Sequence, residues 1–313
     1  MTIDRRTLLL ASMSALLPAG VLAGQDKPSP ETFDYGPAKL DIYAPDGARD
    51  LPVVFFVHGG AWRFGKRSQV NAKPAFLLAN GFCFVSIDYR MLPQADVATQ
   101  AGDVEKAYAY IRANIAQHGG DPNRIVGMGH SAGCHLIALT GMRGELPGVA
   151  GLLLDDTRAY DLAALARNGG MVRAYSRVFS DPSQWAALSP ASYVDGRKHP
   201  PTFIAYSRAD GRGEQSTAFA ERLRASGTDV TLFDGSAYTH MSINRDFGEG
   251  DDALTKAALA FLKSTVGRAH PACLRSMFHS FRSTAYDAAR SRNSAVIAGA
   301  FVECRTGFGV DRS

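Results

Sequence analysis

The sequence predicts an α/β fold with a mostly parallel central sheet and helices on both faces. Short apolar runs alternate with segments of helical periodicity along most of the 313 residues. The run at residues 51–57 is continuously apolar, as expected of a strand buried on both faces. A composition of 46% hydrophobic and 20% charged residues fits a globular chain with a large core. No repeat or low-complexity linker divides it, so we expect one domain over residues 24–267.

The elements follow in order from these patterns. Helical spacing of Ala101, Val104, Tyr108 and Ile111 predicts a helix that packs one face on the sheet. The segment at residues 157–194 breaks the alternation of strand and helix, and we expect it to form a small cap insertion. Strands are predicted at 39–43, 51–57, 82–87, 124–128, 149–154, 201–207 and 230–233, and helices at 72–80, 101–115, 215–226 and 251–265, with a further buried helix from 134.

The pentapeptide at residues 129–133, Gly-His-Ser-Ala-Gly, is the strongest chemical motif. A G-x-S-x-G between a predicted strand and a predicted helix is typical of a nucleophile elbow, in which a tight turn lifts the serine hydroxyl above the sheet edge. Glycines flank the serine because side chains there would collide with the neighbouring strand or helix. Ser131 is therefore the predicted nucleophile.

A glycine-rich turn after residues 51–57 supplies the predicted oxyanion hole. Small residues there let backbone N–H groups point at a carbonyl oxygen without obstruction. We expect Gly60 and Ala61 to donate together with Ala132, which follows the nucleophile.

The general base and its acid should follow the serine in the chain. His240 lies after a predicted strand and just before the last long helix, where a base loop is expected. Asp210, in the turn that ends the preceding strand, is the predicted acid, and Asp234 is the alternative. His135 lies one helical turn beyond Ser131 and is expected to pack.

Four segments together resemble the α/β-hydrolase esterases, near the hormone-sensitive-lipase-like carboxylesterases and the kynurenine-formamidase-like enzymes. These segments are H-G-G-A-W, Asp88-Tyr89-Arg90, residues 120–125 and G-H-S-A-G. The resemblance covers roughly residues 33–266. It implies the α/β-hydrolase fold, Ser131 as nucleophile, His240 as base, Asp210 as acid and Gly60, Ala61 and Ala132 as oxyanion donors. The sequence departs from relatives at Asp155-Asp156-Thr157, where a small Ser-Gly turn is common.

Three functions remain open at this point. The first is a carboxylesterase acting on small, neutral, short-chain esters, and the second is an arylformamidase that cleaves N-formyl-kynurenine. The third, a non-catalytic binding protein, is disfavoured by the intact Ser-Asp-His set. Trp62 and Met241, beside the oxyanion turn and the base, are the predicted substrate-binding residues. No nucleotide-binding loop or zinc-type Cys/His spacing occurs, so no cofactor or metal is expected.

The two ends of the chain differ from its centre. Arg5-Arg6 precedes an apolar stretch too short for a stable membrane span, which predicts a signal peptide at residues 1–23, of twin-arginine or ordinary secretory type. A periplasmic or secreted protein is expected, and N-terminal sequencing of the mature protein, predicted to begin near Gly24, would test this.

The basic tail at 268–313 supplies the net charge of +4, so the remainder of the chain lacks the excess positive charge that nucleic-acid binding requires. Cys273 and Cys304 of this tail could pair in an oxidising compartment.

Overall fold

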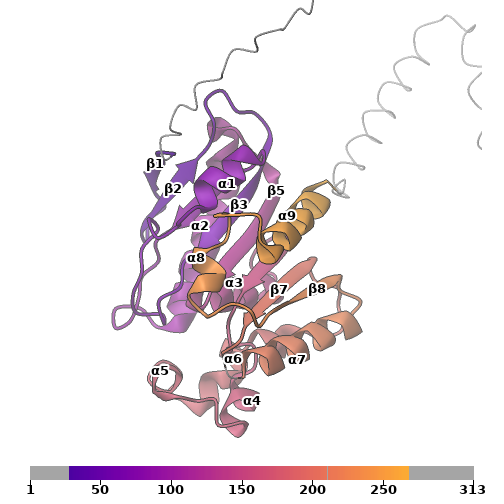
Figure 1. The fold of residues 1–313 in the computed structure, drawn as a ribbon. Helices are drawn as coiled ribbons and strands as arrows, with labels where there is room; N and C mark the ends of the chain where they lie inside the picture. The colour runs from indigo at the N-terminus through magenta and orange to yellow at the C-terminus, as the bar shows by residue number, and fades with distance from the viewer. Residues whose placement is uncertain (1–27, 210, 268–313) are drawn as a thin grey trace, which may run out of the picture.

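The computed structural model describes residues 28–209 and 211–267 (Figure 1), so the predicted signal peptide and the basic tail lie outside the described residues. Its centre is an eight-stranded sheet in the order β1-β2-β4-β3-β5-β6-β7-β8. Strands β1 and β2 join the sheet antiparallel, and every pairing from β4 to β8 is parallel. The predicted α/β-hydrolase fold is confirmed.

The strands lie close to the predicted ranges. β1 was not predicted from the sequence, because it is a four-residue edge strand, exposed along most of its length. The strands are β1 (Glu31–Asp34), β2 (Lys39–Tyr43), β3 (Leu51–Val57), β4 (Cys83–Ile87), β5 (Gly120–His130), β6 (Gly151–Asp155), β7 (Thr202–Ser207) and β8 (Val230–Gly235).

Helices cover both faces of the sheet. Alternate residues of β3 separate the two halves of the core: Val53, Phe55 and Val57 face α2, α3 and α7, while Val54 and Phe56 face α1, α8 and α9. The helices that make these layers are α1 (Lys73–Ala79), α2 (Val97–Asn114) with the 3₁₀ turn η1 (Ile115–His118), α3 (Ala132–Arg143), α7 (Arg212–Ala225), α8 (Ser242–Arg245) and α9 (Ala253–Val266).

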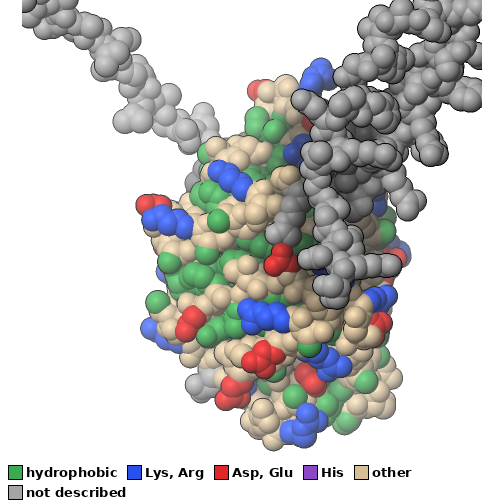
Figure 2. All heavy atoms as spheres, turned by 90° about the vertical axis from the view of Figure 1, so that its right-hand side faces the viewer, with side chains coloured by type: hydrophobic (Ala, Val, Ile, Leu, Met, Phe, Trp, Pro, Cys, Tyr) green, Lys and Arg blue, Asp and Glu red, His purple; other side chains and the backbone are tan. Residues whose placement is uncertain are grey.

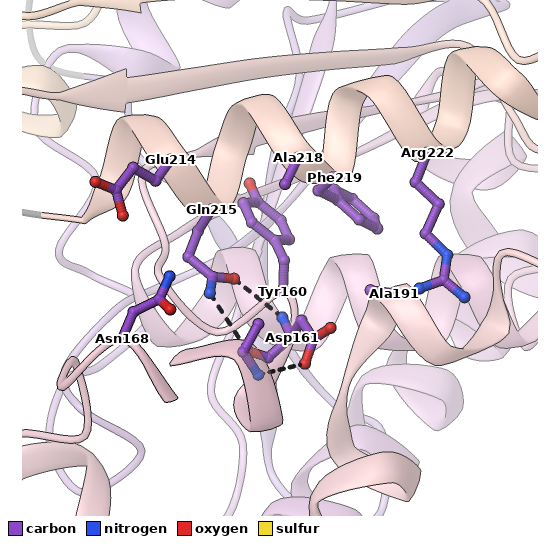
Figure 3. Close-up of a pocket in the computed structure, with 10 residues that line it drawn as sticks. Tyr160, Asp161, Asn168, Ala191, Glu214, Gln215, Ala218, Phe219 and Arg222 are labelled. Atoms are coloured by element: carbon purple, nitrogen blue, oxygen red, sulfur yellow. Dashed lines mark hydrogen bonds between the residues drawn. The ribbon is translucent and has the colours of Figure 1, made fainter. Parts of the chain in front are cut away.

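The insertion between β6 and β7 consists of short helices grouped at the lower end of the molecule in Figure 1. They are α4 (Leu162–Arg167), α5 (Arg173–Ser176), η2 (Pro182–Gln184), α6 (Trp185–Leu188) and η3 (Pro190–Tyr193). The side chain of Gln215 on α7 bonds to both backbone groups of Asp161, just before α4 (Figure 3). A small cavity of about 150 Å³ lies between α7 and the insertion at this point, and the predicted catalytic residues do not line it.

Charged side chains of both signs are interspersed on the face shown in Figure 2. None of the helices in residues 28–209 and 211–267 is long and apolar enough to cross a membrane.

His135, on α3, connects three parts of the fold and packs as the sequence predicted. Its Nδ1 accepts a hydrogen bond from the indole N–H of Trp62 at 3.2 Å, and its Nε2 donates to the Leu188 carbonyl of the insertion at 2.8 Å. The ring is fully buried, and this burial lowers the pKa of His135 from 6.5 to about 4. Both hydrogen bonds require the neutral ring, so His135 joins α3, the turn after β3 and the insertion only in its uncharged form.

We predict that His135 makes the folded protein sensitive to acid. In the unfolded chain His135 takes up a proton below about pH 6.5, whereas in the folded chain it does so only near pH 4. The free energy of unfolding therefore falls as the pH is lowered from 6.5 to 4. A His135→Phe variant should be less stable at neutral pH by about 1–3 kcal/mol, because the Trp62 N–H and the Leu188 carbonyl lose their partner. It should also lose less stability between pH 6.5 and 4 than the wild type, as measured by urea unfolding. Parallel losses in the two proteins would contradict this role.

Candidate active site

Ser131 lies at the junction of β5 and α3 in a left-handed backbone conformation, with φ of 56° and ψ of −114°. This conformation is strained for a residue with a side chain, and the surrounding packing must maintain it. A Cβ on Gly129 would lie 2.4 Å from the Gly133 carbonyl oxygen, and a Cβ on Gly133 would lie 2.0 Å from that of Val57. Both glycines are therefore required for the turn, as the sequence predicted.

His240 lies in the loop between β8 and α8 and points at the nucleophile. Its Nε2 is 3.0 Å from Ser131 Oγ, which is hydrogen-bond distance for a general base. Its Nδ1 is 2.6 Å from Asp156 Oδ2. A neutral imidazole carries one proton, so Nδ1–H donates to the carboxylate and Nε2 is left to accept the serine proton.

The acid that contacts His240 is Asp156, which the sequence analysis did not select. Asp156 follows β6 with φ of 64°, and its side chain is fully buried. Its other oxygen, Oδ1, accepts from the Ser207 N–H at 2.8 Å and lies 3.6 Å from Arg212 Nη1. Burial raises the pKa of Asp156, but the hydrogen bond from His240, the Arg212 charge and the Ser207 amide together hold it below its ordinary value. This carboxylate is therefore ionised and able to stabilise an imidazolium.

The predicted acid, Asp210, lies outside the described residues. The alternative, Asp234, is on β8 and accepts from the Ser236 N–H, so its carboxylate caps its own turn. The contact that the role requires is made instead by Asp156. The sequence did carry a signal for it, because Asp155 and Asp156 stand together at the end of a strand predicted to be buried.

Asp155, the neighbour of Asp156, has a different environment. Its side chain is buried and neither carboxylate oxygen has a hydrogen-bond partner among the described residues. Burial and the charge of Asp156 raise the pKa of Asp155 to about 8. Two adjacent carboxyl groups are thus separated in acidity, and the charge resides on the one that contacts His240.

The turn after β3, which carries the predicted oxyanion donors Gly60 and Ala61, lines the same cavity as Ser131. Gly60 has φ of 130°, and a Cβ there would lie 1.9 Å from the Phe64 carbonyl oxygen. The N–H groups of Gly60 and Ala61 donate to no group in residues 28–209 and 211–267. Ala132 is the first residue of α3, where a backbone N–H has no partner within the helix. Within the described residues, none of the three predicted donors has an acceptor, which leaves them free for a substrate oxygen.

A cavity of about 780 Å³ opens in front of Ser131 and His240. Met241 lines it and is 65% exposed, consistent with the predicted substrate contact, and the equally exposed Phe64 lines it as well. Trp62 does not line this cavity. Its side chain is only 3% exposed and packs edge-on against His135 and Phe179 of the insertion, so it supports the oxyanion turn from within the core.

His130, Asp156 and His240 bring three possible metal-ligating atoms within 4.8 Å of one another. Each of these three side chains already bonds to another group: His130 Nε2 bonds to the His240 carbonyl at 2.9 Å, and His240 Nδ1 and Asp156 Oδ2 bond to each other. The hydrogen bonds account for the cluster without an ion.

Known proteins resemble this chain in sequence and in fold. The BD-FAE family matches residues 40–162. Esterase LipQ of Mycobacterium tuberculosis is 34% identical over 226 residues, covering 64% of this chain and 53% of LipQ. Esterase LipC of the same organism is 34% identical over 199 residues, covering 56% of this chain and 49% of LipC. The chain thus spans about half the length of these curated relatives.

A solved structure, the propionate-bound esterase 2 of Thermogutta terrifontis, superposes with a TM-score of 0.61 at 25% identity, covering 76% of this chain and 93% of that one. The apo form of the same esterase gives the same TM-score and identity. The chain therefore has the α/β-hydrolase fold and is homologous to these esterases.

We predict that Asp156, and not Asp210, orients His240. Asp156→Asn should lower kcat on the order of 10⁴-fold, because the amide favours the wrong imidazole tautomer. Asp210→Asn should lower it less than about ten-fold, and Asp234→Asn, on an exposed turn, serves as the matched control. Steady-state kinetics of the three purified variants decides the matter. A larger loss from Asp210→Asn than from Asp156→Asn would return the role to the residue that the sequence first suggested.

Proposed function

We propose that the protein is a serine carboxylic-ester hydrolase that acts through an acyl-enzyme on small, neutral, short-chain esters. The observation that carries the proposal is the continuous chain of contacts from Ser131 Oγ through His240 to the buried Asp156 carboxylate. The free N–H groups of the oxyanion turn and the cavity in front of Ser131 support it.

The geometry supports the following sequence of steps. His240 Nε2 takes the Ser131 proton as Oγ forms a bond to the ester carbonyl carbon, and the carbonyl oxygen becomes an anion. The backbone N–H groups of Gly60, Ala61 and Ala132 stabilise this anion, each donor being worth about 3 kcal/mol. The carbon–oxygen bond to the leaving alcohol then breaks, and His240 returns the proton to that oxygen. Water repeats the cycle on the acyl-enzyme and releases the acid.

Three observations favour short-chain, uncharged substrates. The cavity wall mixes polar side chains such as Gln69 and Asn71 with the apolar Phe64 and Met241, and does not form a continuous apolar tunnel. Among the described residues on its wall, one side chain is charged, Arg245, and it is paired with Asp246. The homologous esterase 2 of Thermogutta terrifontis has been solved with bound propionate, an acid of the proposed size. No observation favours arylformamidase, although N-formyl-kynurenine remains the informative competing substrate.

We predict that p-nitrophenyl esters of two to four acyl carbons are hydrolysed with the highest kcat/KM, with a decline at longer chains and little turnover of N-formyl-kynurenine. Ser131→Ala should abolish measurable ester turnover while leaving the thermal unfolding midpoint nearly unchanged, because one hydroxyl contributes little to packing. The measurements are initial rates across the ester series for both proteins. Preference for N-formyl-kynurenine over every ester, or undiminished hydrolysis by pure Ser131→Ala protein, would overturn the proposal.

A further inference from the structure

Lys73, at the start of α1, is a fully buried lysine with no part in the proposed chemistry. A buried ammonium is uncommon unless it is paired, because removing it from water is costly. Its Nζ donates a hydrogen bond of 2.6 Å to the Asn244 carbonyl and lies 5.3 and 5.6 Å from the ring centres of Phe56 and Phe247. No salt bridge to Lys73 occurs within the described part of the chain.

The carbonyl that Lys73 binds lies just after the predicted general base, His240. Asn244 is in α8, a single helical turn that begins two residues after His240. Carbonyls in the last turn of a helix have no partner within the helix, and a cation satisfies such a carbonyl well. Lys73 therefore ties the backbone after His240 to α1, which is 171 residues earlier in the chain.

His130 holds the same segment at a second point. Its Nε2 is 2.9 Å from the carbonyl of His240, and the two imidazole rings stack with centres 4.7 Å apart. Burial, followed by the nearby His240, lowers the pKa of His130 to about 3, so the ring is neutral. Because a carbonyl only accepts, the one proton of His130 must be on Nε2.

We propose that Lys73 and His130 are positioning residues that form a two-point clamp on the backbone of residues 240–244 and so hold the His240 ring between Ser131 and Asp156. Neither side chain is hydrogen-bonded to Ser131, to Asp156 or to the ring nitrogens of His240, so both act through the backbone carbonyls. The proposal rests on the proposed function, because a clamp on the base matters only where the base moves a proton. A displacement of about 1 Å at such a group is enough to lower a rate about a hundred-fold.

A different role for Lys73 would be to favour the ionised form of Asp155, which burial and Asp156 otherwise keep protonated. Burial lowers the pKa of Lys73 to about 8, and Asp155, when ionised, is the first carboxylate that opposes this shift, ahead of Glu249. The two roles predict different kcat values when Asp155→Asn is added to a Lys73 variant. Asp155→Asn removes the need for charge balance, but it does not restore the hydrogen bond to the Asn244 carbonyl.

The test compares Lys73→Met with Lys263→Met. Lys263 is an exposed lysine on α9, and its Nζ donates to the half-buried Asn80 side chain at 3.5 Å. With p-nitrophenyl butyrate, Lys73→Met should lower kcat by about ten-fold or more with KM changed less than about two-fold, because the lost bond matters most in the transition state. Lys263→Met should match the wild type. Lys73→Gln, whose amide N–H can still donate to the carbonyl, should recover part of kcat.

A folded Lys73→Met protein with wild-type kcat would overturn the clamp. Recovery of kcat in Lys73→Met combined with Asp155→Asn, but not in Lys73→Gln, would replace it with the charge-balance role. If Lys73→Met does not fold, the His130→Phe variant tests the clamp instead. It keeps an aromatic ring against His240 and removes the hydrogen-bond donor to the His240 carbonyl. It should lower kcat similarly, and full activity would reject the clamp.

The two proposals can fail separately. A wild-type protein inactive on every ester would refute the proposed function. In that case the ¹⁵N-labelled His240 ring resonances still test the clamp: they should shift in Lys73→Met and not in Lys263→Met, and identical spectra would overturn it.

Discussion

The close approach of the α3 N-terminus to the ends of β3 and β5 is the constraint on which the site depends. At Gly133 the helix backbone passes so near the Val57 carbonyl that no side chain fits between them. This contact forces the left-handed turn at Ser131 and brings the nucleophile next to the glycine-rich turn that follows β3. A parallel sheet places the carboxyl ends of its strands at one edge, so the loops after β6 and β8 bring Asp156 and His240 to the same place.

The surroundings of each buried carboxyl group then determine whether it is ionised. Asp156 keeps its charge because hydrogen bonds from His240 and Ser207 and the nearby Arg212 offset its burial. Asp155, one residue earlier and without such partners, has a raised pKa. The polar side chains at this edge are therefore distinguished by the partners that surround them and not by residue type.

Most of the architecture could be predicted from the sequence, because continuous apolar strands and periodic helices leave direct signals. Residues 51–57 were predicted as a strand with the limits that the structure has. Ser131, His240 and the oxyanion turn could be located because their motifs fix both backbone and chain order. The sequence analysis weighed Asp210 and Asp234 as the acid and did not consider Asp156, because side-chain direction after a strand depends on a local φ that the sequence pattern does not reveal. The prediction that Trp62 contacts substrate failed for the same reason. The sequence shows that Trp62 follows the oxyanion turn, but it does not show that the residue has φ of 60° and a side chain buried in the core.

The central claim is that Ser131 alone is activated, by the backbone turn and by His240. Covalent labelling tests it directly: the protein is treated with diethyl p-nitrophenyl phosphate, digested, and the modified peptide is identified by mass spectrometry. We expect one diethylphosphoryl group per chain, on Ser131, formed in step with the loss of ester hydrolysis. Modification of another residue, or loss of hydrolysis with Ser131 unmodified, would contradict it.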